Sequence, residues 1–420
     1  MTGCFRLGRA LFNRRVVQHL DTVVSLLRTL FTTTIRRKQP LRELTLSALA
    51  LAGASQFPSE DFNLNMRSHR LLSLLSSAIL PFNTLARPDR PPSRVGNNDC
   101  PPFSGNFTIH AYQLYPENGD FDFNNCIFYV GILWNSSLGI YNPYQGQLKV
   151  VEFEGISHNP EFHLGGVQYN HRTDLLSIVV DAGAAFNTNG QDISGTNYIM
   201  LWDPKAKKTL YKHNLTEISQ GKYGGPQDIE HDPDNNVYIV NTFPSAIQKV
   251  SASGKNIETW YLDTADNHTV QGFGGLATVG WTLITNDQQT GNLYTFDMRA
   301  KQGTPTQVKV TPDHKFGATD AIHLPRRYCN TVLLVAENGI GFSVYRDKTA
   351  KWKEAEYLGT VKWAGDSVFF TTATFQIGDA VYENLEPFGD PGLEGPGTAG
   401  NRTDFLYWDV TGEIEKLLRG

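Results

Sequence analysis

Acidic and amide side chains recur at the ends of short apolar runs in the body of the chain. One such residue ends the second apolar run of four successive segments, and the set consists of Asp181, Asn241, Asn286 and Glu337. A second set precedes the first run of each segment, where Asp228 and Asp320 alternate with glycines. Carboxyl groups that share one apolar-walled cavity can have their pKa values pushed apart, which yields a general acid and a general base. Oxygen atoms of the same residue types also form the ligand set of a hard cation such as Ca²⁺.

Aromatic side chains and one histidine lie in or near the loops that carry these polar residues. As substrate contacts we single out Trp134, His163 and Phe273, together with Asp181, Asn241 and Asn286. A ring of aromatic side chains around a few carboxyl groups suits a small, apolar, oxygenated substrate, and His163 could pass protons there. Asp and Asn also close turns by binding backbone amides, so a structural role competes with the functional one at each position.

Short strands must position these residues. From about residue 106 onward, runs of β-branched and aromatic residues alternate with turns rich in Gly, Asn, Asp and Pro, which is typical of antiparallel strands. Units of four such runs start near Gly166, Gly225, Gly275 and Asp320, which lie 59, 50 and 45 residues apart. Six units of about 50 residues predict an all-β, six-bladed β-propeller of four-stranded antiparallel blades. We expect residues 107–113 to join the last blade and close the ring, whereas a β-sandwich would not predict such a repeat.

The N-terminal part differs in charge from the rest of the chain. Residues 1–42 carry nine Lys/Arg and one acid, while residues 87–420 carry 38 acids against 26 Lys/Arg. An acidic body argues against a nucleic-acid partner. Residues 66–86 read as a basic start, an apolar core of about 12 residues and small residues at the end, the pattern of a secretory signal peptide that is too short to span a membrane.

We therefore predict four segments. They are a basic leader at 1–65, which we interpret as an extension of the gene model ahead of a start at Met66, a signal-like segment at 66–86, a linker at 87–105 and the propeller at 106–420. This order favours the secretory pathway and an extracellular, monomeric protein. If the basic leader is translated, a mitochondrial or intracellular location is the alternative, since Arg-rich, acid-poor leaders are typical of transit peptides.

Sequons and cysteines fit the secretory interpretation. Asn-x-Ser/Thr occurs at Asn106, Asn135, Asn214, Asn267 and Asn401, and these are candidate glycosylation sites. Cys100 and Cys126 are candidates for one disulfide around the first strands, which would leave Cys329 as a buried thiol. The absence of a C-x-x-C or His/Cys cluster from the sequence disfavours a structural zinc site.

Four stretches resemble a known family. Residues 224–228, 270–275, 285–287 and 335–339 are similar to the fungal trichothecene biosynthesis protein 14 family, and the resemblance extends over roughly residues 100–415. More broadly, the repeat units resemble the lactonohydrolase and strictosidine-synthase-like six-bladed propellers. In metal-dependent members of that group, Glu, Asn and Asp hold a divalent cation in the central channel. Asn241, Asn286 and Glu337 would fill these roles here and hold Ca²⁺, although no Glu stands out in the first blade.

The resemblance implies a part in making trichothecenes, which are sesquiterpenoid mycotoxins. A fitting step for a propeller without a redox cofactor is acid/base closure of an oxygen ring from a hydroxylated precursor. Asp228 and Asp320 are the expected carboxyl pair, with Glu337 next. Two alternatives stay open: a metal-dependent, lactonase-like hydrolase, and a non-catalytic secreted protein that binds a ligand or promotes virulence.

Overall fold

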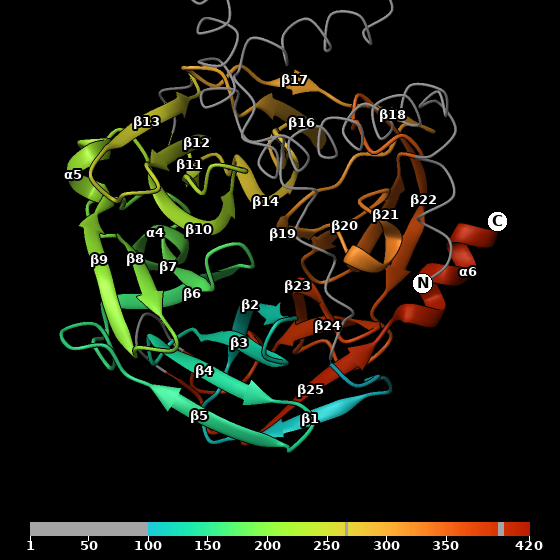
Figure 1. Ribbon diagram of the computed structural model, residues 1–420, viewed down its shortest axis with the longest axis horizontal. Coiled ribbons are helices and arrows are strands. Elements are labelled where there is room, and N and C mark those ends of the chain that lie inside the picture. The colour runs from blue at the N-terminus through green and yellow to red at the C-terminus, as the bar shows by residue number, and fades with distance from the viewer. Residues whose placement is uncertain (1–99, 265–267, 394–398) are drawn as a thin grey trace, which may run out of the picture. The chain divides into compact units, whose positions relative to one another are not determined.

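The computed structural model describes residues 100–264, 268–393 and 399–420. Within them the chain forms six sheets of strands, arranged as blades around a common axis (Figure 1). The six-bladed β-propeller predicted from the repeat is therefore confirmed. The leader at 1–65, the signal-like segment at 66–86 and most of the linker lie outside the described residues. No helix of the described part is long and apolar enough to cross a membrane.

The first three blades each follow the chain outward from the axis. Blade 1 consists of β2 (Pro116–Asp122), β3 (Ile127–Ile132), β4 (Ser137–Asn142) and β5 (Gln147–Val151). Blade 2 consists of β6 (Phe162–Asn170), β7 (Leu175–Ala182), β8 (Tyr198–Asp203) and β9 (Lys208–Asn214). Blade 3 consists of β10 (Gly224–His231), β11 (Val237–Phe243), β12 (Ala246–Val250) and β13 (Ile257–Leu262). Short helices α4 (Ala184–Asn187) and α5 (Leu215–Ser219) belong to the connections of blade 2.

The last three blades depart from this scheme in one or two strands. Blade 4 consists of β14 (Phe273–Val279), β15 (Thr282–Asp287), β16 (Asn292–Asp297) and the two-residue β17 (Thr306–Gln307). Blade 5 has five strands, β19 (Thr319–His323), β20 (Val332–Glu337), β21 (Gly341–Arg346), β22 (Glu354–Lys362) and an outer β18 (Lys309–Thr311). Blade 6 consists of β23 (Phe370–Ile377), β24 (Ala380–Glu386), β25 (Asp404–Asp409) and β1 (Phe107–His110).

The N-terminal strand closes the ring. β1 pairs antiparallel with β25, with Phe107 opposite Tyr407 and His110 opposite Asp404. The two ends of the propeller therefore share one sheet, and blade 6 has its fourth strand only when β1 pairs with β25. The predicted closure by residues 107–113 is confirmed for its first four residues.

Two blades depart from the regular repeat. In blade 4, β17 pairs with β16, and after Val308 the chain crosses to blade 5, where β18 runs parallel to β22. In blade 6, the innermost strand β23 is followed by the second strand, β24, which ends on Glu386.

Neighbouring blades pack through apolar side chains on their facing sides. Tyr129 and Leu138 of blade 1, for example, share one buried cluster with Val167 and Ile178 of blade 2. Each such side chain contributes roughly 1.5–3 kcal/mol by burial. Since no single blade can bury both of its faces, this packing makes the blades depend on one another.

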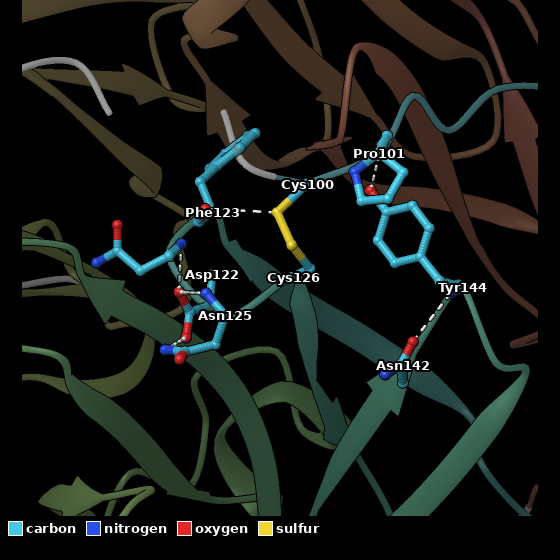
Figure 2. The surroundings of a disulfide bond; sticks show 9 residues. Cys100, Pro101, Asp122, Phe123, Asn125, Cys126, Asn142 and Tyr144 are labelled. Atoms are coloured by element: carbon cyan, nitrogen blue, oxygen red, sulfur yellow. Dashed lines mark hydrogen bonds between the residues drawn. A yellow bond between two sulfur atoms is a disulfide. The ribbon is translucent and has the colours of Figure 1, made fainter. Parts of the chain in front are cut away.

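A disulfide fastens the start of the described chain to blade 1 (Figure 2). It joins Cys100 to Cys126, which lies in the turn between β2 and β3. In the same turn, Asp122 accepts hydrogen bonds from the backbone amides of Asn124 and Asn125 at 2.7 and 2.9 Å. Cys329 is not the thiol that the sequence predicts, since none of the described cysteines is free.

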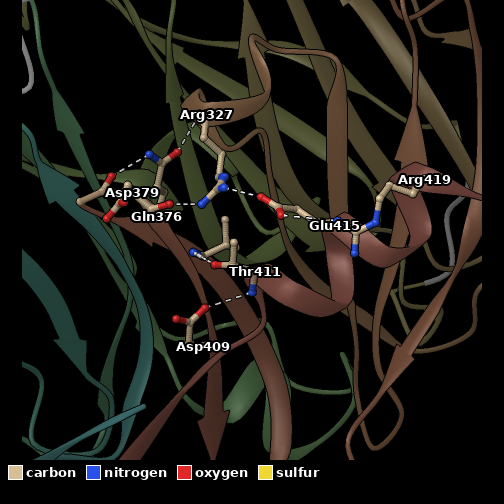
Figure 3. Close-up of polar contacts among 9 residues, drawn as sticks. Arg327, Gln376, Asp379, Asp409, Thr411, Glu415 and Arg419 are labelled. Carbon is tan, nitrogen blue, oxygen red and sulfur yellow. Dashed lines mark hydrogen bonds and ion pairs between the residues drawn. The ribbon is translucent and has the colours of Figure 1, made fainter. Parts of the chain in front are cut away.

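The C-terminal helix α6 (Thr411–Arg419) packs on blade 5, and Arg327 is one of the residues that attach it there (Figure 3). Arg327, in the 3₁₀ turn η2 (Arg326–Tyr328), forms an ion pair with Glu415 of the helix. The same guanidinium donates to the backbone oxygen of Asp379 in blade 6. The contact therefore joins elements of two blades to the helix.

All six innermost strands carry a β-bulge at an equivalent place. The register shifts lie between Pro116 and Gly119, Leu164 and Val167, Pro226 and Asp228, Phe273 and Leu276, Thr319 and Ile322, and Thr371 and Ala373. A bulge bends its strand and changes the direction of the side chains next to it. The repeated bulge thus determines which residues of the innermost strands face the axis.

Candidate functional site

A cavity of about 250 Å³ lies at one end of the axis, beside the bulges. Its polar lining consists of Glu117, His163, Asp181, Asn187, Gln227, Thr242, Gln271, Gln288, Thr319, Asp320 and Asn338. Its remaining lining consists of Leu133, Trp134, Gly165, Phe186 and Phe388. All six blades or their connections contribute, so the closed ring is what assembles this site.

Glu117 belongs to the bulge of β2 and is buried. Its Oε2 atom makes no hydrogen bond to any described residue. Burial, followed by the charges of Asp320 and Asp181, raises the pKa of Glu117 well above its usual value. Burial of this kind favours the protonated form of the carboxyl group, which can act as a general acid.

Asp320 belongs to the bulge of β19 and lines the same cavity. Burial raises its pKa to about 7, although a hydrogen bond from the Asn338 side chain acts in the opposite direction. Gln227 is held beside it, since its Nε2 atom donates to Gly274 O at 2.8 Å and lies 3.4 Å from Asp320 Oδ1. A carboxyl group that titrates near 7 can accept a proton at physiological pH.

Asp181 and His163 form a second pair of titratable groups in the cavity wall. His163 Nδ1 lies 3.7 Å from Asp181 Oδ2, beyond a good hydrogen bond, and both side chains are almost fully buried. Burial lowers the pKa of His163 to about 4 and raises the pKa of Asp181 well above its usual value. The imidazole is therefore neutral at pH 7, and its Nε2 atom has no partner among the described residues.

One wall of the cavity, next to His163, is aromatic. The Trp134 ring lies 5.6 Å from Phe388 and 5.7 Å from the His163 ring, measured between centroids. Phe388 remains 37% exposed, so this wall extends from the cavity to solvent. Phe186 of α4 packs on Phe243 at 5.5 Å and brings the blade 2 connection to the rim. Apolar walls of this kind strengthen electrostatic interactions inside a cavity.

Asp228 does not line the cavity. Its carboxylate accepts hydrogen bonds from Asn118 Nδ2 at 3.2 Å and from the backbone amides of Ile229 and Leu276 at 2.9 and 2.8 Å. It therefore joins blades 1, 3 and 4. Burial raises the pKa of Asp228 to about 7, but its oxygens are occupied by the protein itself.

Glu337 and Asn241 face the interiors of their blades. Glu337 accepts from Ser343 Oγ and lies 3.6 Å from His314 Nε2. Asn241 donates to Gln248 Oε1 at 3.2 Å. The residues next in sequence, Thr242 and Asn338, line the cavity instead.

Asn286 and Phe273 also lie outside the cavity. The Asn286 amide donates to Thr319 Oγ1 at 2.7 Å and accepts from Gly275 N at 2.6 Å, which joins blades 4 and 5. Phe273 packs in the core on Tyr261 at 5.6 Å. Of the residues that the sequence singles out for the site, the structure thus brings together Trp134, His163, Asp181 and Asp320.

The predicted metal ligands do not meet. Asn241, Asn286 and Glu337 point into three different environments, as described above. Nowhere in the described ranges do three or more His, Cys, Asp or Glu side chains gather closely enough to hold a metal ion.

Sequence reasoning missed Glu117, although the order of strands could have found it. Every blade needs an innermost strand directly before its second strand, and in blade 1 that place is taken by residues 116–122. Glu386 of β24 was missed as well. It is fully buried, neither carboxyl oxygen has a hydrogen-bond partner in the described part, and burial raises its pKa well above the usual value.

Fold and site together define a six-bladed propeller with an acidic, aromatic-walled cavity on its axis. Residues 97–360 match the family of Mal s 1 allergenic protein-like proteins, and the chain belongs to this family. It is 33% identical over 363 residues to trichothecene biosynthesis protein 14 of Trichoderma arundinaceum, which covers 82% of this chain and 99% of that protein. It is also 33% identical over 338 residues to core trichothecene cluster protein 14 of Fusarium sporotrichioides, covering 76% and 88%. The resemblance stated from the sequence is thus confirmed.

A solved structure supports the fold independently. The major allergen Mala s 1 of Malassezia sympodialis superposes with a TM-score of 0.64 over 73% of this chain and 96% of that chain, at 20% identity. At this identity the likeness concerns the fold alone.

Proposed function

We propose that the protein acts in trichothecene biosynthesis as an enzyme that closes an oxygen ring by acid/base catalysis. Two relatives of similar length carry names that assign them to trichothecene biosynthesis. The observation that carries the mechanistic part is a set of three carboxyl groups around one cavity with an aromatic wall: the buried Glu117 and Asp181 and the partly buried Asp320. Carboxyl groups with perturbed pKa values in a cavity are typical of catalytic sites.

The proposed step needs one acid and one base. Asp320 accepts the proton of the attacking hydroxyl, whose oxygen forms a bond to an allylic carbon of the substrate. Glu117 protonates the hydroxyl that departs from that allylic system, and the C–O bond breaks as water leaves. Atoms balance as loss of one water, and no oxidant or reductant is required. Glu117 takes the role that the sequence suggested for Asp228, because the Asp228 oxygens are bound by three donors.

The cavity walls contribute by holding the substrate. A flexible precursor that lies against Trp134 and Phe388 with its hydroxyl groups toward the carboxyl groups is already near the ring-closed shape. Orientation of this kind can supply a large part of a rate enhancement. The neutral His163 adds one further hydrogen-bonding atom at the cavity surface.

A set of four variants of the full chain tests the proposal. Glu117→Gln and Asp320→Asn should each abolish most ring closure of a hydroxylated sesquiterpenoid precursor, followed by mass spectrometry. Asp228→Asn and Glu337→Gln are the matched controls, since they change buried carboxyl groups outside the cavity. Full activity of both cavity variants would remove the assignment. Loss of activity in EDTA with rescue by Ca²⁺ would favour the lactonase-like alternative, and saturable binding without turnover would favour a ligand-binding protein.

We also propose that the protein is exported and glycosylated. Asn106 and Asn401 are exposed, whereas the Asn214 side chain caps α5 by accepting from the amides of Thr216 and Glu217. Asn267 lies outside the described residues. Treatment with an endoglycosidase should shift the mobility of protein secreted by a fungal host. An unchanged mobility of wild type, equal to that of Asn106→Gln/Asn401→Gln, would count against glycosylation at these sites.

A further inference from the structure

Gly165 and Gly166, which are adjacent in the bulge of β6, differ in the space available for a side chain. A Cβ atom on Gly166 would lie 2.5 Å from the backbone oxygen of Gln227, so this glycine is required for the close packing of blades 2 and 3. Gly165 has no such conflict. A Cβ atom there would meet only Glu117 and Asp181 side-chain atoms, at ordinary contact distances of 3.5 Å or more. Packing of the fold therefore does not explain why residue 165 lacks a side chain.

The space above Gly165 lies between two carboxyl groups. A Cβ position on this residue is 3.5 Å from Glu117 Oε2 and 3.7 Å from Asp181 Oδ1. Glu117 Oε2 and the second oxygen of Asp181 have no hydrogen-bond partner among the described residues. Gly165 itself lines the cavity. A small polar atom that approaches the bare Cα can thus reach both side chains at once.

We infer that a substrate hydroxyl lies over the Cα of Gly165, between Glu117 and Asp181, and that this glycine makes the cavity select hydroxylated over plain hydrocarbon ligands. A hydroxyl group has one donor and two acceptor positions. It can accept a hydrogen bond from the protonated Glu117 and donate its own proton to Asp181. A methyl or methylene group in the same place would leave two buried carboxyl groups unpaired, which is the situation that sites built for a hydroxyl reject most strongly.

The aromatic wall determines how the rest of the ligand lies. Trp134 and Phe388 offer their ring surfaces to the cavity, and Phe388 extends this surface to solvent. The ligand class is therefore a compact hydrocarbon with a hydroxyl group on the edge that points toward Gly165. This inference rests on the proposed function only in identifying that hydroxyl as the one that Glu117 protonates on departure. The binding preference itself does not require turnover.

Three non-reacting ligands measure the preference in the wild-type full chain. They are a saturated sesquiterpene alcohol, which cannot ionise because it lacks the allylic double bond, its methyl ether and its parent hydrocarbon. Dissociation constants follow from tryptophan fluorescence or calorimetry. We expect the alcohol to bind at least about 10-fold more tightly than the other two, since the position has room for an oxygen but not for an added methyl. Equal affinities for all three would overturn the inference without any variant.

Gly165→Ala then tests the residue. The added methyl group occupies the hydroxyl position, so we expect the alcohol to lose about 10- to 200-fold in affinity while the hydrocarbon changes little. The melting temperature should equal or exceed that of wild type, because the backbone of Gly165 is not in the left-handed region and alanine restricts the unfolded chain. Gly412→Ala is the matched control: this glycine lies in α6, and a Cβ there meets no atom within 4 Å.

The outcomes separate this inference from the proposed function. Equal weakening of alcohol and hydrocarbon in Gly165→Ala would mean that the glycine supplies volume alone, and the hydroxyl assignment would be wrong. An alcohol preference that Gly165→Ala removes, in a protein that closes no ring, would leave this inference standing and reject the proposed chemistry.

Discussion

Buried carboxyl groups occur in two regions of this propeller, and the two regions treat them in opposite ways. In the hairpin turns, buried aspartates accept from backbone amides, and Asp347 is the fullest example: it accepts from the amides of Thr349, Lys351 and Trp352 at 2.7, 2.9 and 2.6 Å. In the axial cavity, Glu117 and Asp181 each keep one oxygen without a hydrogen-bond partner among the described residues. Asp347 is 5% exposed and Glu117 and Asp181 are 8% and 2% exposed, so their contacts differ mainly in the supply of hydrogen-bond donors.

The difference in donors sets the charge of each group. Burial alone would raise the pKa of Asp347, but hydrogen bonds from Thr349 and the following amides outweigh it and lower the pKa below its usual value. Burial without such donors raises the pKa of Glu117 and Asp181. A buried carboxylate is stable only where donors compensate for lost water. Asp347 is thus a charged part of the fold, whereas burial favours the neutral, protonated forms of Glu117 and Asp181.

We expect the largest effect on activity from a substitution that prevents a cavity carboxyl group from giving up a proton. Glu117→Gln keeps the shape of the side chain but cannot protonate a departing hydroxyl, so ring closure should fall by about 10²- to 10⁴-fold. Stability should stay equal or rise, since a neutral amide replaces a group that burial disfavours when charged. Initial rates and thermal melts of the same preparation measure both. A variant that is inactive because it is unfolded would contradict the assignment of Glu117 to the cavity chemistry.

The strand that carries Glu117 could not be predicted from its own residues alone. The repeat of β-branched runs predicts six blades because the second and third strands are apolar on both sides. The innermost strand of blade 1 reads Pro-Glu-Asn-Gly-Asp-Phe-Asp, which is the composition of a turn. It forms a strand because it pairs with β3 and packs between β6 and β23, the innermost strands of the two adjacent blades. Amino-acid preference for β-strands predicts strands least well where they face a polar channel, and the candidate site lies at such a channel.

Strand register explains the other misplaced residues. The sequence aligns Asp181 with Asn241 and Glu337 as ends of equivalent strands. In the structure Asp181 lines the cavity together with Thr242 and Asn338, one residue further along. Side chains alternate between the two faces of a strand, so an error of one residue moves a side chain to the opposite face. The β-bulges that shift the strand register cannot be located from a single amino-acid sequence.

Carboxyl groups of the innermost strands should determine how stability depends on pH. Burial raises the pKa of Asp120, Glu230 and Asp320 to about 7, above the value near 4 of unfolded carboxyl groups. The folded state therefore binds more protons than the unfolded state, and the stability from these groups is full below about pH 4 and lost as pH rises through 7.

Buried histidines oppose this trend at lower pH. Burial lowers the pKa of His171, His231 and His323 to about 3, so they favour folding more as pH rises toward 6.5 and then have no further effect. The clear window is therefore above pH 6.5. We expect the free energy of unfolding to fall by roughly a few kcal/mol between pH 6.5 and 8.5. Urea unfolding at three pH values measures this, and Glu230→Gln should flatten the curve. A rise in stability over the same window would contradict the neutral state of these groups.

Removing a turn carboxylate should act on stability alone. Asp347→Ala leaves three amide donors in a buried turn without their acceptor, which costs about 1–3 kcal/mol for each donor that water cannot reach. The control is Asp203→Ala, where the carboxylate also accepts two backbone amides, from Lys205 and Ala206, but in a solvent-exposed turn. We expect a clear loss of stability only for Asp347→Ala, with ring closure per folded molecule unchanged in both. A fall in that specific activity would show that the turn aspartates reach the cavity.

The smallest effect is expected at Glu337, a buried carboxyl group that lies neither in a hairpin turn nor in the cavity lining. Glu337 is buried between Ser343 and His314 inside blade 5, one residue from the cavity-lining Asn338. Glu337→Gln keeps an acceptor for the Ser343 hydroxyl, so the hydrogen bond can persist with a neutral partner. Activity should therefore stay within about 3-fold of wild type, because an interaction outside the reacting groups contributes little to the barrier. A loss comparable to that of Glu117→Gln would mean that one residue of strand register does not separate catalytic from structural carboxyl groups. Catalytic importance would then follow from all the carboxyl groups around the axis together, and not from those that have an oxygen without a hydrogen-bond partner.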